Sequence, residues 1–169
     1  MVDEKKITVE KDEILIFLDI DGVLVTWDSL LENKNATRER DIFDKKCTSI
    51  FNDIIMLSSK KCKIIISSSW RIGRRIEELQ NIFTKNNVSI LPFSKTGSSK
   101  TGQRGKEILT WLSDNNLSHV NTNFLVIDDE ICDITPFIDL KKIYQIRGSL
   151  KTGLIEEDKL NILKRIKEL

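Results

Sequence analysis

The chain has 169 residues, of which 40% are hydrophobic and 31% are charged, with only 7 Gly and 2 Pro. This composition excludes a disordered or collagen-like chain, and the length fits one ordinary domain covering residues 1–169. Lys and Arg number 27 against 26 for Asp and Glu, so the net charge is +1. Overall charge therefore indicates neither a polyanion nor a membrane surface as partner, and any electrostatic attraction must be local.

The N-terminal segment, the apolar runs and the cysteines indicate a cytoplasmic protein with reduced thiols. The N-terminal segment MVDEKKITVEKDE is too charged for a signal peptide, and the longest apolar runs are too short to cross a bilayer. Cys47, Cys62 and Cys132 form no CxxC pair, and His119 is the single histidine. These residues do not make a zinc set, so we expect three buried, reduced thiols.

Short apolar runs alternate with amphipathic stretches along the chain. The run ILIFL at residues 14–18 is typical of a strand buried on both faces. A flap at 23–27 and an irregular polar segment at 28–39 follow. Further strands are predicted at 63–67, 88–93, 124–127 and 143–146, and helices at 43–57, 72–83, 105–115 and 156–169. In the last helix Leu160, Leu163 and Ile166 are expected to face the core.

This alternation predicts an α/β fold with a doubly wound, mostly parallel sheet and helices on both faces, of the Rossmann-like type. In such sheets a ligand binds beyond the carboxyl ends of the strands. The residues that follow each predicted strand are therefore the candidate site residues.

The first strand ends in the sequence LDIDG, which contains Asp19, Asp21 and Gly22. Alternating residues of an extended segment point to the same side, so the two carboxylates lie together and repel each other unless a cation joins them. A divalent ion such as Mg²⁺ fits, because it takes carboxylates together with phosphate oxygens. Gly22 allows a tight turn and a close backbone approach. The alternative is a solvated strand end with two ordinary surface acids.

The fourth strand ends in VIDDE, with Asp128 and Asp129 at its end. Alone, this cluster is also explained as the N-terminal cap of a helix. Together with Asp19 and Asp21, however, it places two carboxylate pairs at one edge of one sheet. Such a cluster is costly without a metal, which favours a shared ion.

Hydroxyl and basic residues follow the second and third strands. Ser67 and Ser68 can donate hydrogen bonds to a phosphate oxygen, and Arg71 either grips that phosphate or lies in solvent. In the basic loop before the third helix, Arg104 or Lys106 can reach a bound phosphate, unless the loop is a solvated face.

In this order, the motifs LDIDGVL (18–24), ISS (66–68), Arg104 or Lys106, and IDD (127–129) resemble the haloacid dehalogenase-like phosphohydrolase superfamily. The stretches SSSWR (67–71), TGQRGKEILTWL (101–112) and FLVIDDE (124–130) further resemble its small capless branch in Swiss Army Knife RNA repair proteins. The superfamily resemblance spans about residues 13–133.

The resemblance implies a mechanism and a ligand set. Asp19 is then the nucleophile that forms an aspartyl-phosphate, and Asp21 is the general acid and base. Ser67 hydrogen-bonds the transferring phosphoryl group, with Gly22, Ser68 and Arg71 beside the substrate. The superfamily's cationic residue is Arg104 or Lys106. Mg²⁺ would be held by Asp19, the Asp21 carbonyl, Asp128 and Asp129.

The short segments around the expected site imply no cap or a minimal one, and therefore an open site. An open site suits a large phosphorylated substrate, such as a nucleic-acid end or a phosphoprotein, and closes poorly over a small phosphate ester. A response-regulator receiver also uses clustered acids and Mg²⁺, but its motifs come in a different order. A non-catalytic binding module on the same fold remains an alternative, and nothing in the sequence indicates the oligomeric state.

Overall fold

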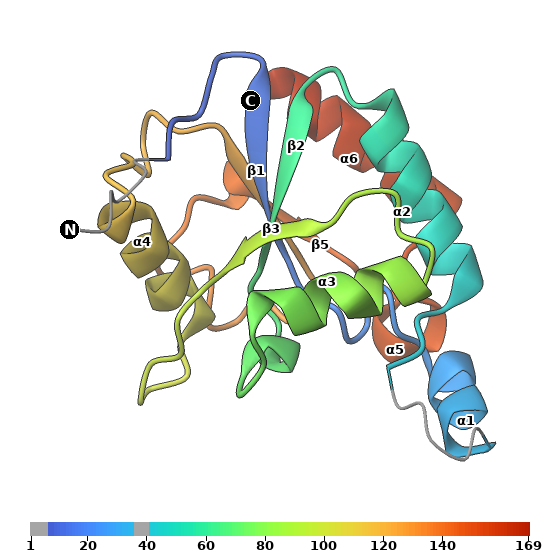
Figure 1. Ribbon diagram of the computed structural model, residues 1–169. Helices are drawn as coiled ribbons and strands as arrows, with labels where there is room; N and C mark the ends of the chain where they lie inside the picture. The colour runs from blue at the N-terminus through green and yellow to red at the C-terminus, as the bar shows by residue number, and fades with distance from the viewer. Residues whose placement is uncertain (1–6, 36–40) are drawn as a thin grey trace.

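The computed structural model describes residues 7–35 and 41–169. Five strands form one sheet in the order β3-β2-β1-β4-β5, and all neighbouring pairs are parallel (Figure 1). The predicted parallel α/β sheet is therefore confirmed. The strands are β1 (Glu13–Leu18), β2 (Lys61–Ile66), β3 (Pro92–Lys95), β4 (Phe124–Asp128) and β5 (Ile143–Gln145).

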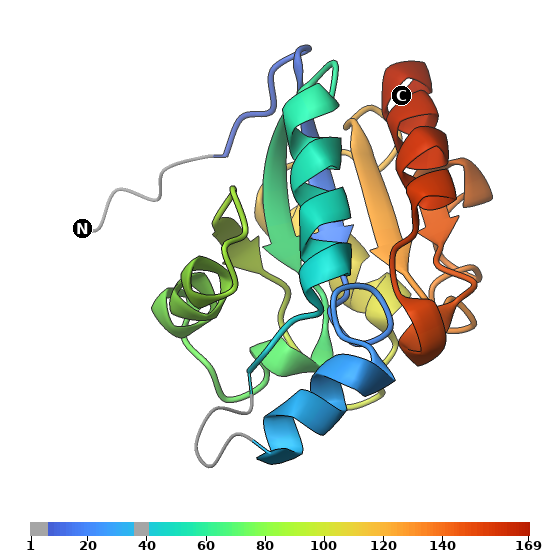
Figure 2. The same cartoon turned by 90° about the vertical axis from the view of Figure 1, so that its right-hand side faces the viewer.

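Helices cover both faces of the sheet because the central strands are apolar on both sides. Ile14, Ile16 and Leu18 of β1 pack in a core with residues of α2, α3 and α6, whereas Leu15 and Phe17 pack in a second core with residues of α4. Figure 2 shows α2 and α6 side by side on the first face. The helices are α1 (Trp27–Asn35), α2 (Lys45–Leu57), η1 (Ser69–Arg71), α3 (Ile76–Lys85), α4 (Arg104–Asp114), η2 (Leu140–Lys142), α5 (Ser149–Thr152) and α6 (Glu156–Glu168).

The segment between β1 and α2 differs from its prediction. Residues 23–25 make a compact buried turn, where Asp21 and Val25 form an isolated bridge. The segment predicted as irregular, 28–39, contains most of helix α1, and its last part, 36–39, lies outside the described residues. Helix α1 lies at the periphery of the molecule (Figure 1).

Three smaller predictions were also wrong. Strand β3 spans Pro92–Lys95, later than the predicted 88–93, and it begins at Pro92 because proline is tolerated at the first position of an edge strand. Leu160 is 66% exposed, and Ile162 takes its place in the core beside Ile166. Cys132 is exposed and Cys62 is half-buried, so only Cys47 of the three free thiols is buried as predicted. No described helix has the length and apolar composition needed to span a membrane.

Candidate active site at the carboxyl ends of the strands

The strand register brings four polar side chains into one row. Leu18 pairs with Ile66 on one side and with Ile127 on the other, so Asp19 comes level with Ser67 and Asp128. The backbone ladder continues past the strand ends, where the amides of Asp19 and Ser67 donate to Ile127 and Leu18, both at 3.0 Å. Thr96 extends the row beside Ser67 in the same way, donating to Ile66 at 3.0 Å.

This row faces α4. Phe17, Ile65 and Val126, two residues earlier in their strands, belong to the core beneath α4, and side chains two apart in a strand share a face. The row itself is buried: Asp19 is 5% exposed and Asp128 is fully buried. Polar groups so deep in a core are expensive unless they are paired or bind a ligand.

Three carboxylates at this edge fit a divalent cation. Asp19, Asp128 and Asp129 each offer an oxygen, and these oxygens all lie within 4.8 Å of one another. Oxygens on opposite sides of one ion with ligands at about 2.0–2.6 Å lie roughly 4–5 Å apart, so the donor set suits Mg²⁺ or a similar hard cation. The Asp21 carboxyl is not part of this group of three.

Gly22 makes room for the third carboxylate. It has φ of +73°, and a Cβ added there would stand 2.2 Å from Oδ2 of Asp129. Only glycine combines this backbone conformation with so close an approach. The same Oδ2 accepts a hydrogen bond from the Ser149 hydroxyl. The glycine predicted for a tight turn thus also lets Asp129 reach the acid cluster.

Asp21 lies beside the cluster but has a different partner. Its Oδ1 accepts a hydrogen bond from the indole Nε1 of Trp70 at 3.0 Å. Asp21 is half-buried, and it lines a cleft of about 320 Å³ with Asp19, Ser69, Arg71 and Arg104, among others. Asp21 therefore reaches the same cleft as Asp19 without joining the three clustered carboxylates.

The two predicted serines differ in their contacts. The Ser68 hydroxyl hydrogen-bonds the Asp19 carboxyl and also accepts from the Trp70 amide at 3.4 Å. The Ser67 hydroxyl is buried and has no hydrogen-bond partner within the described residues, as is true of Thr96. An unsatisfied buried hydroxyl costs about 1–3 kcal/mol, so Ser67 is the one with capacity for a ligand oxygen.

The structure separates the two predicted cations of α4. The Arg104 guanidinium lies 2.7 Å from Asp128 and 3.8 Å from Asp19, and it also pairs with Asp133. Gly105 lets the start of α4 pack closely, since a Cβ there would lie 3.0 Å from the Asp133 carbonyl. Lys106 instead holds its Nζ over the Phe137 ring, 5.2 Å from its centroid. It is thus Arg104 that faces the acids, and the prediction for Lys106 has no support in its placement.

Arg71 also differs from its predicted role as a substrate contact. Its guanidinium donates to backbone carbonyls on both sides of the cleft and forms an ion pair with Glu107. A guanidinium has five N–H donors, and all are engaged here. The carbonyl acceptors are those of Ser67, Ser68, Thr96 and Gly97. No donor remains for a phosphate, so Arg71 joins the loops that form the cleft.

Burial, together with repulsion between neighbouring acids, raises the pKa values of three acids at this site. Burial is the main cause that raises the pKa of Asp19 to about 6, while the hydrogen bond from Ser68 and the charge of Arg104 oppose the rise. Burial, followed by repulsion from Asp19, raises the pKa of Asp128 to about 8. Burial also raises the pKa of Asp21, and the hydrogen bond from Trp70 opposes it. Arg104 does not balance three carboxylates, and a divalent ion would supply the missing positive charge.

A family comparison now identifies the domain. Residues 15–158 match the family model described as the HAD domain in Swiss Army Knife RNA repair proteins, where HAD stands for haloacid dehalogenase. The chain belongs to this family. No curated protein and no solved structure shows significant similarity to it. Membership in the family supports a HAD-type phosphohydrolase, as the motif order predicted.

Several residues of this HAD domain that shape the site were missed from the sequence. The sequence has no signal for the hydrogen bond from Trp70 to Asp21, and Thr96 was missed because the third strand was predicted too early. Glu107 and Ser149 hold Arg71 and Asp129 through contacts distant in the chain. Only Thr96 had a usable signal, since a correct strand end would have placed it level with Ser67.

Proposed function

We propose that this HAD domain is a Mg²⁺-dependent phosphatase that hydrolyses a phosphate monoester, with the phosphorylated end of a nucleic acid as its favoured substrate. The observation that carries the proposal is the meeting of Asp19, Asp128 and Asp129 around one point, with Arg104 beside them. The RNA repair family to which the chain belongs favours a nucleic-acid end over a phosphoprotein or a small ester.

The first half-reaction transfers the phosphoryl group to Asp19. A carboxylate oxygen of Asp19 attacks phosphorus as the bond from phosphorus to the leaving oxygen breaks, and Asp21 gives its proton to that oxygen. The raised pKa of Asp21 favours the protonated carboxyl that this step needs. Asp19, with its pKa raised to about 6, is mainly ionised near neutral pH, as a nucleophile must be.

The second half-reaction restores the enzyme. Asp21, now ionised, takes a proton from water as the water oxygen attacks the phosphorus of the aspartyl-phosphate. The bond from Asp19 to phosphorus breaks, and inorganic phosphate leaves. Asp21 is protonated again, so atoms and protons balance over the cycle.

The remaining residues stabilise charge on the phosphoryl group. The Ser67 hydroxyl donates a hydrogen bond to one oxygen of the phosphoryl group, and Arg104 neutralises the negative charge that builds up on the phosphoryl oxygens. Asp19, Asp128 and Asp129 would hold Mg²⁺, which when bound supplies positive charge to the phosphoryl oxygens. Ser68 holds the Asp19 carboxyl, and Arg71 fixes the loops on either side of the cleft.

Release of inorganic phosphate by the purified chain tests the proposal. Substrates are p-nitrophenyl phosphate, RNA oligonucleotides phosphorylated at the 3′ or 5′ end, a phosphotyrosine peptide and a nucleotide, each with Mg²⁺ or with EDTA. We expect metal-dependent turnover that Asp19→Asn abolishes, and a steep fall with salt for the oligonucleotides alone. If the chain hydrolyses none of these esters, the phosphatase proposal is wrong and a binding module remains.

A further inference from the structure

The Asp21 carboxyl needs a device to fix its direction. Unlike Asp19 and Asp128, it is half-buried and stands outside the group of clustered carboxylates. A carboxyl in such a position rotates between several rotamers unless a hydrogen bond holds it. Among the described residues, the one side chain that hydrogen-bonds it is the Trp70 indole, at 3.0 Å from Nε1 to Oδ1.

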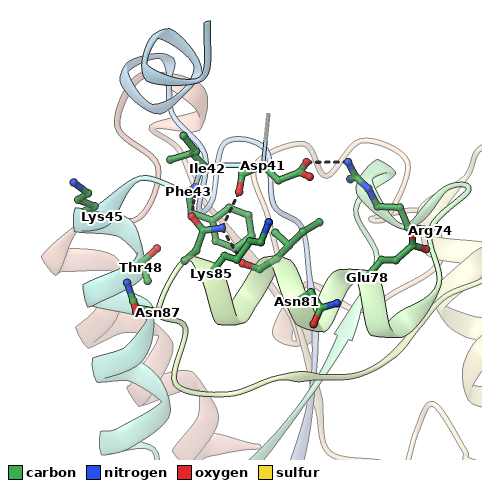
Figure 3. Close-up of a pocket in the computed structure, with 12 residues that line it drawn as sticks. Asp41, Ile42, Phe43, Lys45, Thr48, Arg74, Glu78, Asn81, Lys85 and Asn87 are labelled. Atoms are coloured by element: carbon green, nitrogen blue, oxygen red, sulfur yellow. Dashed lines mark hydrogen bonds and ion pairs between the residues drawn. The ribbon is translucent and has the colours of Figure 1, made fainter. Parts of the chain in front are cut away.

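The indole of Trp70 is itself held on two sides. The Phe43 ring meets it edge-on, with centroids 5.6 Å apart, and the Arg74 guanidinium lies 5.2 Å from the ring centroid. Arg74 is fixed in turn by Asp41 at 2.8 Å, a contact visible beside the cavity between α2 and α3 (Figure 3). The N–H of Trp70 therefore has one direction, and it points at Asp21.

The same short turn serves Asp19 and Asp21 together. Helix η1 follows Ser68, whose hydroxyl hydrogen-bonds Asp19 and accepts from the Trp70 amide. One residue supplies a backbone contact toward the nucleophile and a side-chain contact toward the acid. Trp70 itself is not among the residues lining the described cleft, whereas Asp21 is.

We propose that Trp70 is a positioning residue that occupies Oδ1 of Asp21 and so directs Oδ2, with its proton, toward the leaving oxygen. This role rests on the proposed function, in which Asp21 is the general acid. The indole N–H does not lose its proton near neutral pH and is already donated to Oδ1 of Asp21, so in this role it acts through Asp21.

The proposal makes leaving-group dependence the decisive measurement. An aryl oxide such as p-nitrophenolate leaves without a proton, whereas an alkyl or ribose oxygen must be protonated as it leaves. Loss of the Trp70 hydrogen bond should therefore slow alkyl phosphates and largely spare aryl phosphates. A role in folding alone would slow both to the same extent.

Trp70→Phe removes the N–H and keeps most of the ring, and Trp111→Phe is its matched control. Trp111 makes an equivalent hydrogen bond, from its Nε1 to the Ser94 hydroxyl at 3.1 Å. It packs in the core on the opposite face of the sheet from the core that Trp70 packs against. For Trp70→Phe we expect kcat for β-glycerophosphate to fall about tenfold or more, and kcat for p-nitrophenyl phosphate by less than about threefold, with both KM values unchanged. For Trp111→Phe the ratio of the two rates should stay at the wild-type value.

A double variant keeps the test sharp if Trp70→Phe also loosens the fold. With Asp21→Asn already present, Trp70→Phe should cause no further loss on β-glycerophosphate, because the group it positions is gone. Equal losses on both substrates, or full additivity with Asp21→Asn, would overturn the positioning role. A rise in KM for an oligonucleotide at constant kcat would do so too, by making Trp70 a substrate contact.

The wild-type chain separates this inference from the proposed function. Turnover of both esters by the wild type, with the same rate ratio in Trp70→Phe, leaves the phosphatase standing and removes the role of Trp70. A wild-type chain inactive on both esters and on the phosphorylated oligonucleotides, peptide and nucleotide removes the phosphatase and the positioning role together.

Discussion

Arg71 and Arg104 line the same cleft, yet their guanidinium groups have different kinds of partner. Arg71 is 5% exposed and donates mainly to backbone carbonyls of the two loops beside it, with Glu107 as its one carboxylate. Arg104 is 18% exposed at its side chain and faces the carboxylates of Asp19, Asp128 and Asp133. One arginine connects backbone segments, and the other balances acidic side chains.

The different partners shift the pKa values of the two guanidinium groups in opposite directions. Burial lowers the pKa of Arg71, and Glu107 only partly compensates. Burial also acts to lower the pKa of Arg104, but the attraction of Asp128, Asp133 and Asp19 outweighs it and the net pKa is raised. Residue type therefore does not decide whether an arginine at this cleft serves the fold or the reaction. Its partners do, and the two roles make separable predictions.

The largest effect is expected for the fold. Arg71→Ala leaves Glu107 buried without its partner and removes the donors to several carbonyls, so the free energy of unfolding should fall by about 3–5 kcal/mol. Chemical denaturation measures this. Arg75→Ala is the matched control, because Arg75 is exposed and its ion pair with Glu78 spans 3.7 Å, and it should cost less than about 1 kcal/mol. Equal, small losses in both variants would contradict the structural role of Arg71.

Arg104 should affect the reaction more than Arg71 does. Arg104→Ala removes the cation beside the proposed nucleophile, and we expect kcat/KM for p-nitrophenyl phosphate to fall about 10²–10³-fold, or about 3–4 kcal/mol in the barrier. Arg104→Lys should recover part of this loss, since it restores charge without the bidentate geometry. Activity near the wild-type level in Arg104→Ala would show that another cation faces the substrate.

The acids of the cluster predict a smaller effect that depends on pH and metal. The folded-state pKa values of Asp19, about 6, and Asp128, about 8, lie above the ordinary aspartate value of 3.8. The metal-free folded state thus holds protons that the unfolded state releases. The stability due to these groups is greatest at low pH and is lost as the pH rises through about 6 and about 8.

We therefore expect the free energy of unfolding in EDTA to fall steadily between pH 5 and pH 8. Mg²⁺ should stabilise the protein most at pH 8, where the carboxylates are free to bind it. Denaturation curves at both pH values, with EDTA or Mg²⁺, measure this, and Asp128→Asn should flatten the dependence. A stability in EDTA that rises over this range would contradict the raised pKa values.

The sheet and its acids were readable from the sequence for physical reasons. Central parallel strands are buried on both faces, so the run at Ile14–Leu18 is continuously apolar and easily found. The polar residues that end such runs are equally visible, and the rule that ligands bind at the carboxyl edge assigns them a place. Asp19 and Asp128 could therefore be assigned to one site without coordinates.

Features with a weak local pattern were missed. Helix α1 has a mainly polar sequence, WDSLLENKN, so helical periodicity is faint there. The edge strand β3 is short and begins with Pro92, which hid its true end and with it Thr96. Side-chain direction is a property of tertiary packing: no local signal shows that Trp70 reaches Asp21, 49 positions away.

The smallest effect is expected for Lys106, which the sequence could not distinguish from Arg104 as the phosphate-binding cation. Lys106 follows Arg104 by two positions on α4, which turns its side chain about 200° around the helix axis. Its Nζ lies over the Phe137 ring, an exposed contact worth about 0.5–1 kcal/mol. Lys106→Ala should therefore keep kcat/KM within about twofold of the wild type and lower stability by less than about 1 kcal/mol. A loss of activity as large as that of Arg104→Ala would mean that α4 rotates when substrate binds, and the distinction between the two cations would disappear.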